Sequence, residues 1–435
     1  MGKGSSPPRW RQRLERDALA ILAGALRAAD PSPLVQAALE RARPEIRGRQ
    51  VRLMALGKAA WPMARAALAL PWLRPLNGVV ACPQVDASRV RKPLVACAGE
   101  HPVPGPGSFK AGRALLALAR GAGREDTLIL LLSGGGSALA AVPARGLSAA
   151  DKTRIHQSLL RSGLRIGPVN LIRSRFSRLK GGCLAATASP ARLLTLALLD
   201  VPRSQPWACA SGPTLRLPAR FAMDPVWLRQ AGILLPPRAA ALLGHSAPPP
   251  VRSRRGGSRP GTRFVVLGDR QLAAAGARSA ARRLGYAVRV SGRAVRGDAV
   301  RLGKRLAREA ARAAERARPG CLIWTGEPTV RLGSGAGNGG RCQQTALSAA
   351  LAMEPVPGAL VVCVGTDGQD GPGWAAGARV DHRTASRIRA SGLVPEMHLR
   401  QRDAGPALSA AGALIETGPT GTNVNDLFLV LTAGS

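Results

Sequence analysis

The apolar run over residues 126–132 most constrains the fold, because it ends directly in a glycine loop, residues 133–137. A run that is apolar on both faces predicts a buried strand of a parallel sheet. Glycines let a ligand approach the main chain, and the N–H groups at the start of a following helix attract anions. The pattern fits an anion-binding loop and a plain tight turn equally. The loop residues are Ser133, Gly134, Gly135, Gly136 and Ser137.

Further apolar runs of strand length end in a glycine or in a polar residue that could carry chemistry. These are 50–56 before Gly57 and Lys58, 192–199 before Asp200, 320–325 before Glu327, and 359–364 before Thr366 and Asp367. Helically spaced segments separate most of them, which predicts an α/β fold. In open α/β sheets, ligands bind at the carboxyl ends of the strands. We therefore expect the polar groups at that edge in both halves of the chain.

A stretch rich in proline and arginine marks the predicted domain boundary. It predicts an N-terminal domain over 1–246, a linker over 247–262 and a C-terminal domain over 263–435. The C-terminal domain is expected to open with a strand over 263–267 and a helix over 270–284.

The charge of the chain is unusual, with 63 lysines and arginines against 25 acids and a formal net charge of +38. Such a charge attracts nucleic acid or anionic substrates. However, the excess is nearly all arginine and is scattered along the chain, and only 3% of residues are aromatic, too few for a base-stacking surface. A coding bias towards arginine is favoured over nucleic-acid binding. The seven cysteines lack metal-finger spacing, and no uninterrupted apolar run is long enough for a membrane span, so a reduced, cytoplasmic protein is expected.

The second half contains a further glycine loop over 332–341 that ends in Arg341. An arginine there suits a clamp on a phosphoryl group, although a flexible hairpin with a surface arginine has the same pattern. Asp367 and Asp370 lie in a glycine turn, where carboxylates hold Mg²⁺ or satisfy turn N–H groups. Lys58 could neutralise a phosphate or be a surface lysine. The chain has no Walker-type P-loop, and its Gly-x-Gly-x-x-Gly match over 335–340 lacks a preceding apolar strand.

Taken together and in order, the motifs resemble the glycerate 2-kinases of the MOFRL type, whose members are also labelled hydroxypyruvate reductases. The similarity runs from about residue 17 to 431. The matching segments are Leu56-Gly57-Lys58-Ala59-Ala60, the loop 132–139, Ser177-Arg178-Leu179-Lys180-Gly181-Gly182, Ala210-Ser211-Gly212-Pro213-Thr214, 326–330, Gly339-Gly340-Arg341, 365–372 and 417–424.

The resemblance implies two α/β domains, an N-terminal Rossmann-like parallel sheet with flanking helices and a C-terminal MOFRL domain, with the active site in the cleft between them. It implies ATP-dependent phosphorylation of D-glycerate at its 2-hydroxyl with Mg²⁺. Lys58 and Arg341 match the reaction centre, and Asp200 matches a base or metal contact, while the metal ligands stay open. The implied substrate and phosphate-binding residues are Ser133, Gly134, Gly135, Gly136, Ser137, Lys180, Ser211, Glu327, Thr366, Asp367, Asp370, Thr420 and Asn423.

Other functions stay open at this point. A non-catalytic or nucleic-acid-binding relative is suggested by the charge and by departures from the family pattern at Leu199, Arg203-Ser204, Gln344 and Gly373-Trp374, some of which remove acids. A hydroxypyruvate reductase is the third reading. A homodimer is compatible with the sequence, which does not fix the oligomeric state, and no membrane partner is expected.

Overall fold

The computed structural model describes residues 8–162, 164, 166–217, 225–245, 261–330, 337–354 and 356–434. These residues form two compact units, Asp30–Asp269 and the combination of Met1–Ala29 with Arg270–Ser435. We call them the parallel-sheet unit and the mixed-sheet unit. Most of the predicted linker (247–260) and part of the second glycine loop (332–336) lie outside the described residues.

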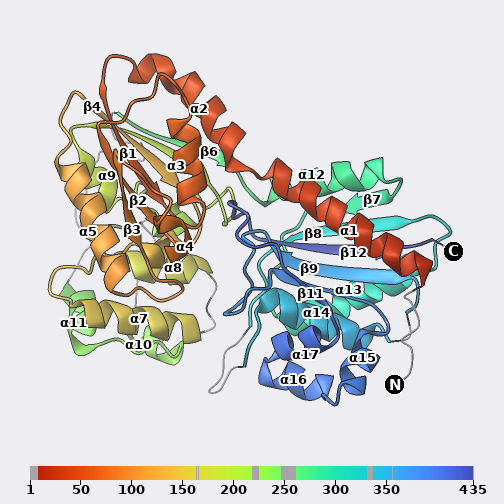
Figure 1. Cartoon of the computed structure of the whole chain (residues 1–435). Helices are drawn as coiled ribbons and strands as arrows, with labels where there is room; N and C mark the ends of the chain where they lie inside the picture. The colour runs from red at the N-terminus through yellow and green to blue at the C-terminus, as the bar shows by residue number, and fades with distance from the viewer. Residues whose placement is uncertain are drawn as a thin grey trace. The chain divides into compact units, whose positions relative to one another are not determined.

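The parallel-sheet unit is built on six parallel strands in the order β3-β2-β1-β4-β5-β6 (Figure 1). The strands are β1 (Gln50–Leu56), β2 (Asn77–Cys82), β3 (Leu94–Ala98), β4 (Asp126–Leu132), β5 (Arg192–Leu198) and β6 (Thr262–Gly268). β4 is buried along its whole length, as its apolar sequence predicts. This is the strand order of doubly wound nucleotide-binding folds, so the predicted Rossmann-like sheet is confirmed.

Helices cover both faces of this sheet. One face carries α2 (Pro31–Ile46) and α3 (Ala60–Leu68), and the other carries α5 (Pro106–Arg120), α6 (Gly136–Leu139) and α9 (Cys183–Ala188). A short helix α4 (Gln84–Ala87) and the 3₁₀ segment η1 (Pro206–Ser211) complete these layers. The main core lies under α5 and α9, around Leu115, Leu130 and Leu184.

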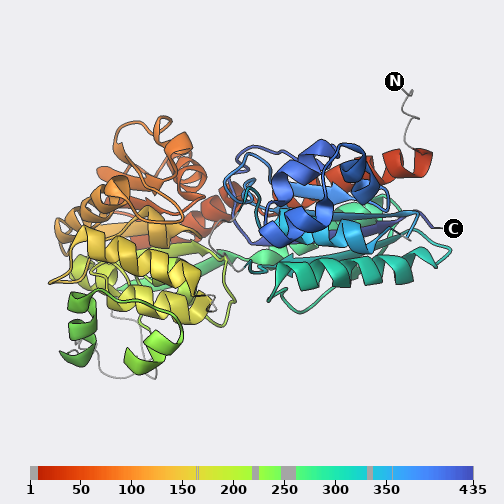
Figure 2. The same cartoon turned by 90° about the horizontal axis from the view of Figure 1, so that it is seen from below.

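A second, smaller core belongs to helices that stand apart from the sheet. They are α7 (Ala149–Arg161), α8 (Ile166–Arg175), α10 (Pro225–Gln230) and α11 (Pro237–His245). Ile155, Ile172, Phe176 and Leu228 are buried among them. Figure 2 shows the yellow and green helices of this group side by side. α7 begins at a capping box made by Ser148 and Asp151.

The mixed-sheet unit contains a six-stranded sheet in the order β11-β10-β9-β12-β8-β7, in which only β7 and β8 pair in parallel. Its strands are β7 (Ala287–Val290), β8 (Gly320–Gly326), β9 (Ala359–Gly365), β10 (Gly377–Val380), β11 (Leu414–Ile415) and β12 (Asp426–Thr432). Its helices are α1 (Arg9–Ala28), α12 (Arg270–Arg283), α13 (Ala299–Ala314), α14 (Arg341–Ala352), α15 (Thr384–Ala390), α16 (Pro395–Gln401) and α17 (Ala404–Ala410). α13 and α14 cover one face of the sheet, and α1 and α12 cover the other (Figure 1).

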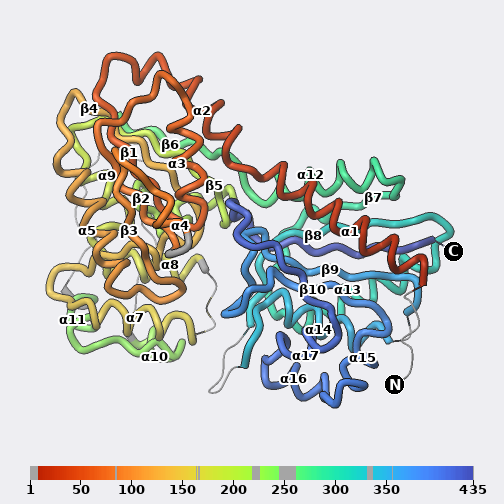
Figure 3. The backbone as a smooth tube through the Cα atoms, viewed as in Figure 1, coloured from red at the N-terminus to blue at the C-terminus, as the bar shows by residue number. Residues whose placement is uncertain are grey.

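The structure divides the chain at other places than the predicted boundaries. α1 packs along α12, as the backbone trace in Figure 3 shows, and therefore belongs to the mixed-sheet unit. The two helices approach closely because Gly24 faces Gly276 and Ala280, where an added Cβ would lie within 2.7 Å of a neighbouring atom. The strand expected to open the C-terminal domain is β6, which pairs with β5 and closes the parallel sheet.

The segment Arg9–Ile46 is long and apolar enough to cross a membrane by length and composition alone. Leu14, Ile21 and Leu22 of α1 are nevertheless buried in the mixed-sheet unit, which is the behaviour of a core helix. All seven cysteines are free thiols.

Candidate functional site

The parallel sheet reverses its winding between β1 and β4. These two strands are neighbours, and their last residues, Leu56 and Leu132, are paired in register. In such sheets, ligands bind in the crevice at the carboxyl ends of the two strands that flank the reversal. Lys58 follows β1 and Ser133 follows β4, so both predicted residues lie at the edge where a ligand is expected.

The two loops at this edge are joined by hydrogen bonds. The N–H of Ser133 donates to the carbonyl of Leu56 over 2.9 Å, and the N–H of Lys58 donates to the carbonyl of Gly134 over 2.9 Å. The N–H of Ala59 donates to the Ser133 hydroxyl over 3.0 Å. Only glycine fits at Gly57, because φ is +127° and an added Cβ would lie 2.2 Å from Ser133 Oγ. The position of Lys58 is thereby fixed by the glycine loop itself.

Gly135 lets the Lys58 side chain lie against the loop. Its φ of +80° is left-handed, and an added Cβ would meet the Lys58 side chain at 2.9 Å and the His101 ring at 3.5 Å. The stem of Lys58 therefore passes directly over Gly135, with His101 beside it. No hydrogen bond to another described residue occupies the N–H groups of Gly135 and Gly136. These donors and the Lys58 ammonium suit a phosphate or a carboxylate.

Behind the loop lies a buried chain of polar side chains. Ser137 and Ser211 share a hydrogen bond 2.5 Å long, and the Ser211 hydroxyl donates to Asn170 Oδ1 over 3.1 Å. Asn170 in turn donates to the carbonyl of Ala208 over 2.7 Å. Ala210 and Ser211 both have positive φ, 47° and 61°. Each such conformation costs about 1–2 kcal/mol in a residue other than glycine, and such strain concentrates at functional sites.

Lys180 and Asp200 lie close to this chain. The Lys180 ammonium is buried and donates to the carbonyl of Gly136 over 2.8 Å, so it supports the glycine loop from within. Asp200 follows β5, next to β4, and is half-buried. Burial raises the pKa of the Cys209 thiol, and the nearby Asp200 carboxylate raises it further.

In the mixed-sheet unit, Arg341 is held by two acids. It is the first residue of α14, and its Nε and Nη2 donate to Asp426 over 2.6 and 2.9 Å. Its Nη1 donates to Glu327 over 2.6 Å. Asp426 is buried, whereas about a third (35%) of the Arg341 side chain is exposed. Although burial lowers it, Asp426 and Glu327 raise the pKa of Arg341 well above its usual value. Arg341 is therefore a fixed cation with one open face.

Asp370 caps the same helix. Its two oxygens accept the N–H groups of Cys342 and Gln343 over 3.0 and 2.7 Å. Burial raises the pKa of Asp370, and the two N–H groups oppose that shift. The turn that contains Asp370 thereby fixes the start of α14 and the backbone of Arg341.

The remaining residues predicted in this unit gather around the end of β9 and the start of β12. The Thr366 hydroxyl donates to the carbonyl of Asn425 over 2.6 Å and accepts the N–H of Val424 over 2.9 Å. The Thr420 hydroxyl donates to the carbonyl of Thr366. Asn423, three residues after Thr420 in the chain, is buried. The Asp367 carboxylate accepts a hydrogen bond from the N–H of Gln369 over 3.3 Å.

The structure thus gathers the predicted residues into two sets, one in each unit. The set of the parallel-sheet unit is Lys58, Ser133, Gly134, Gly135, Gly136, Ser137, Lys180, Asp200 and Ser211, and that of the mixed-sheet unit is Glu327, Arg341, Thr366, Asp367, Asp370, Thr420 and Asn423. The sequence reading missed Asp426, His101, Asn170 and Arg173. Only Asp426 had a usable signal, because it directly follows the matched segment 417–424 at the start of an apolar run.

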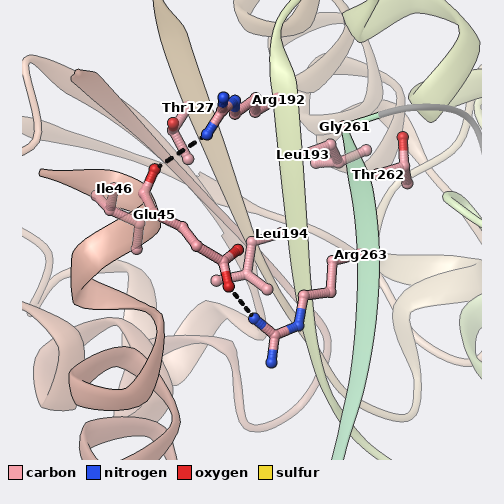
Figure 4. Close-up of a pocket in the computed structure, with 9 residues that line it drawn as sticks. All are labelled: Glu45, Ile46, Thr127, Arg192, Leu193, Leu194, Gly261, Thr262 and Arg263. Atoms are coloured by element: carbon pink, nitrogen blue, oxygen red, sulfur yellow. Dashed lines mark hydrogen bonds and ion pairs between the residues drawn. The ribbon is translucent and has the colours of Figure 1, made fainter.

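A surface hollow in the parallel-sheet unit lies away from these residues. Figure 4 shows it at the start of β4, β5 and β6, where Thr127, Arg192 and Arg263 lie beside the end of α2. Glu45 forms an ion pair with Arg263 over 2.6 Å there. This is the amino edge of the strands, opposite the edge where such sheets bind ligands.

Family models match most of the chain. The domain of unknown function DUF4147 matches residues 17–244, and the MOFRL family matches residues 320–426. A D-glycerate 2-kinase of Thermotoga maritima is 32% identical over 97% of this chain and 99% of its own length. The chain belongs to the glycerate 2-kinase family. The family resemblance predicted from the motifs is thus confirmed.

Further relatives place the chain within this family. The crystal structure of the glycerate kinase of Thermotoga maritima matches with a TM-score of 0.78 at 32% identity, over 97% of this chain and 100% of that one. A putative hydroxypyruvate reductase of Agrobacterium vitis is 36% identical over 88% of this chain and 87% of its own length. Relatives of this chain are thus named either as glycerate 2-kinases or as hydroxypyruvate reductases.

Two departures from the family pattern have local roles. Gln344, at a position where the pattern expects an acid, is buried and donates to the carbonyl of Leu399 over 2.6 Å. Arg203 forms an ion pair with Asp269 over 2.8 Å.

Proposed function

We propose that this protein is a cytoplasmic glycerate 2-kinase that transfers the γ-phosphoryl group of ATP to the 2-hydroxyl of D-glycerate, giving 2-phospho-D-glycerate. The observation that carries the proposal is Lys58 fixed over the glycine loop at the switch point of a doubly wound sheet. Phosphoryl transfer demands mainly positioning and stabilisation of negative charge, and fixed cations with free N–H donors supply both.

In this proposal, the cations act on the group in transfer. Lys58 and the N–H groups of Gly135 and Gly136 hold negative oxygens. Arg341 contributes its open face, and its acid partners keep the guanidinium oriented so that little ordering entropy is lost during catalysis. Asp200 accepts the proton of the 2-hydroxyl while the glycerate oxygen bonds to the γ-phosphorus and the bond to the ADP oxygen breaks.

Magnesium fits the acids present. No cluster of three or more metal-binding side chains occurs in the described part of the chain. A Mg²⁺ ion that arrives with nucleotide needs only one or two carboxylates, because phosphates and water complete its octahedron. Glu327 and Asp367 are the acids we propose for this role, and the ion would neutralise charge on the phosphates.

The activity is tested with ATP, Mg²⁺ and D-glycerate, with enolase added but no phosphoglycerate mutase. The ultraviolet absorbance of phosphoenolpyruvate then rises only if the phosphate is on the 2-hydroxyl. If ADP forms only when D-glycerate is present and that rise does not occur, the 3-hydroxyl is phosphorylated. In a parallel reaction, the oxidation of NADH by hydroxypyruvate measures reductase activity. Turnover in that reaction alone would overturn the kinase proposal.

Replacing Lys58 tests the site. We expect Lys58→Met to lower kcat by about 10²–10³-fold, the usual effect of removing one fixed charge-stabilising donor. Lys110→Met, at an exposed lysine of α5, is the matched control and should keep wild-type turnover. If the two variants turn over equally, Lys58 has no catalytic role.

A further inference from the structure

Four basic side chains are buried together behind the glycine loop. Lys152 and His156 lie one turn apart on α7, Arg173 lies on α8, and Lys180 follows α8 in the chain. Their exposed fractions are 2%, 1%, 8% and 2%. We call them the buried basic cluster. No carboxylate forms an ion pair with any of them among the described residues.

The cluster leaves most of its hydrogen-bond donors unused. The Lys152 ammonium makes one hydrogen bond, to the carbonyl of Arg173 over 2.8 Å, and the Lys180 ammonium makes one, to Gly136. Arg173 Nη1 lies 3.4 Å from Asn170 Oδ1, while Arg173 Nε has no partner, and neither ring nitrogen of His156 has one. Buried polar groups are almost always hydrogen-bonded, and a buried charge without a partner is strongly unfavourable.

Deprotonation of these side chains does not remove all of the buried positive charge. Burial, together with Arg173, lowers the pKa of Lys152 to about 7. Burial and the neighbouring cations lower the pKa of His156 and of Lys180 well below their usual values. Burial lowers the pKa of Arg173 only to about 10, so this guanidinium is charged at neutral pH. At least one buried cation therefore needs an anion that the described residues do not supply.

The cluster is connected to the glycine loop. Arg173 contacts Asn170, which accepts the Ser211 hydroxyl, and Ser211 bonds to Ser137 at the end of the loop. Lys180 reaches the same loop through Gly136. An anion held by the cluster would therefore lie next to the loop that carries Lys58. The fold places unpaired positive charge where the non-reacting end of an acidic substrate would need it.

We propose that the buried basic cluster binds the carboxylate of the hydroxy-acid substrate, with Arg173 as the main contact and Ser137 and Lys180 beside it. This inference rests on the proposed function for the identity of the acid. It makes Arg173 a specificity-determining residue, because a planar guanidinium can bind a carboxylate through two parallel hydrogen bonds. An alcohol of the same size without the carboxylate cannot replace the substrate.

Binding to the full-length protein without ATP tests the proposal. Calorimetry and thermal unfolding compare D-glycerate, glycerol and inorganic phosphate as ligands. We expect D-glycerate to bind the wild type and to raise its melting temperature, and glycerol to do neither. Arg173→Met should weaken D-glycerate binding at least about tenfold, the loss typical of one charged hydrogen bond. Arg161→Gln removes an exposed arginine of α7 and is the matched control, which should bind like the wild type.

Stability separates a ligand-binding role from a structural one. If the cluster awaits an anion, Arg173→Met removes an unpaired buried charge and should raise the melting temperature of the ligand-free protein. A purely structural arginine would instead lower the melting temperature on replacement and leave D-glycerate binding intact. Should Arg173→Met fail to fold, Arg173→Lys keeps the charge without the planar group, and its KM for D-glycerate should rise while its KM for ATP stays unchanged.

The remaining outcomes are also decisive. Binding of phosphate that depends on Arg173, with D-glycerate binding unaffected, would assign the cluster to a phosphoryl group and overturn the carboxylate proposal. Absence of binding by both anions would overturn it as well. Binding of D-glycerate that depends on Arg173, without turnover in the presence of ATP, would support the cluster and reject only the kinase proposal.

Discussion

Replacing Asp426 by asparagine tests whether the acid pair around Arg341 serves catalysis. The substitution keeps the size of the side chain and removes its charge. In the wild type, both oxygens of Asp426 accept from Arg341, over 2.6 and 2.9 Å. In the variant, one oxygen is replaced by an NH₂ group that faces an N–H donor. Arg341 then keeps Glu327 as its charged partner.

The magnitude follows from the geometry. Unit charges about 4 Å apart attract each other by about 4 kcal/mol at an effective dielectric constant of about 20. Burying the Asp426 carboxylate offsets much of that gain, and burial raises its pKa to about 7 against the opposing effect of Arg341. The free energy of unfolding should therefore change little. Loss of an orienting partner typically lowers activity by about 10–100-fold, and we expect that loss in kcat.

The enolase-coupled assay gives kcat and KM for both substrates, and thermal unfolding reports the fold. Glu327→Gln is the matched comparison, because Glu327 receives a single hydrogen bond from Arg341 and about 40% of its side chain is exposed. We expect the smaller effect there. A kcat for Asp426→Asn equal to that of the wild type, with the fold intact, would refute the idea that the bidentate pair orients Arg341 for catalysis.

Three further predictions concern stability. Gly57→Ala should lower the free energy of unfolding by more than about 2 kcal/mol, because its Cβ would overlap Ser133 Oγ. Chemical denaturation measures this change. An unchanged denaturation midpoint would contradict the close approach of the two loops. Folding lowers the pKa of Lys152 from 10.5 to about 7. Between pH 7 and pH 10.5, Lys152 is therefore protonated in the unfolded chain and mostly neutral in the folded one. Stability of the ligand-free protein should therefore rise with pH across that window, by up to about 1.4 kcal/mol per pH unit from this group, and Lys152→Met should remove that contribution to the slope. Gly276→Leu should separate α1 from α12 and lower the free energy of unfolding by roughly 1–3 kcal/mol through overpacking. The control Gly285→Ala lies at a glycine without close neighbours, so it should lower the free energy of unfolding only by the strain of its positive φ.

The sheets could be predicted because local sequence determines them. Runs that are apolar on both faces, such as 126–132 and 359–364, became the fully buried strands β4 and β9. Polar residues at the ends of these runs, Ser133 and Thr366, lie where the strand direction places them. Strand ends can therefore be read from the chain, since both the apolar run and its glycine or polar stop are local features.

Strand partners and domain membership could not be read in the same way. The pairing of β6 with β5 joins residues on both sides of the predicted linker, so the composition change there did not mark the end of the unit. α1 packs on α12 through small residues that look like ordinary helix residues in sequence. Both facts depend on contacts between segments that are distant in sequence, and hydrophobic periodicity carries no information about such contacts.

Charge gives the sharpest contrast between sequence and structure. Among 63 lysines and arginines, the glycine loop before Arg341 separates that residue from the other arginines, whereas no pattern in the sequence separates Arg173. Their surroundings separate them in opposite ways. Arg341 has two acids and an exposed face, so its charge is already balanced and its orientation is fixed for a group that arrives and departs. Arg173 is buried without an acid partner among the described residues, and in our proposal a ligand balances its charge. In a kinase for a small acid, the balanced and partly exposed Arg341 suits the phosphoryl group, which is present only during transfer. The buried Arg173 suits the carboxylate, because the bound acid brings the negative charge that its surroundings lack.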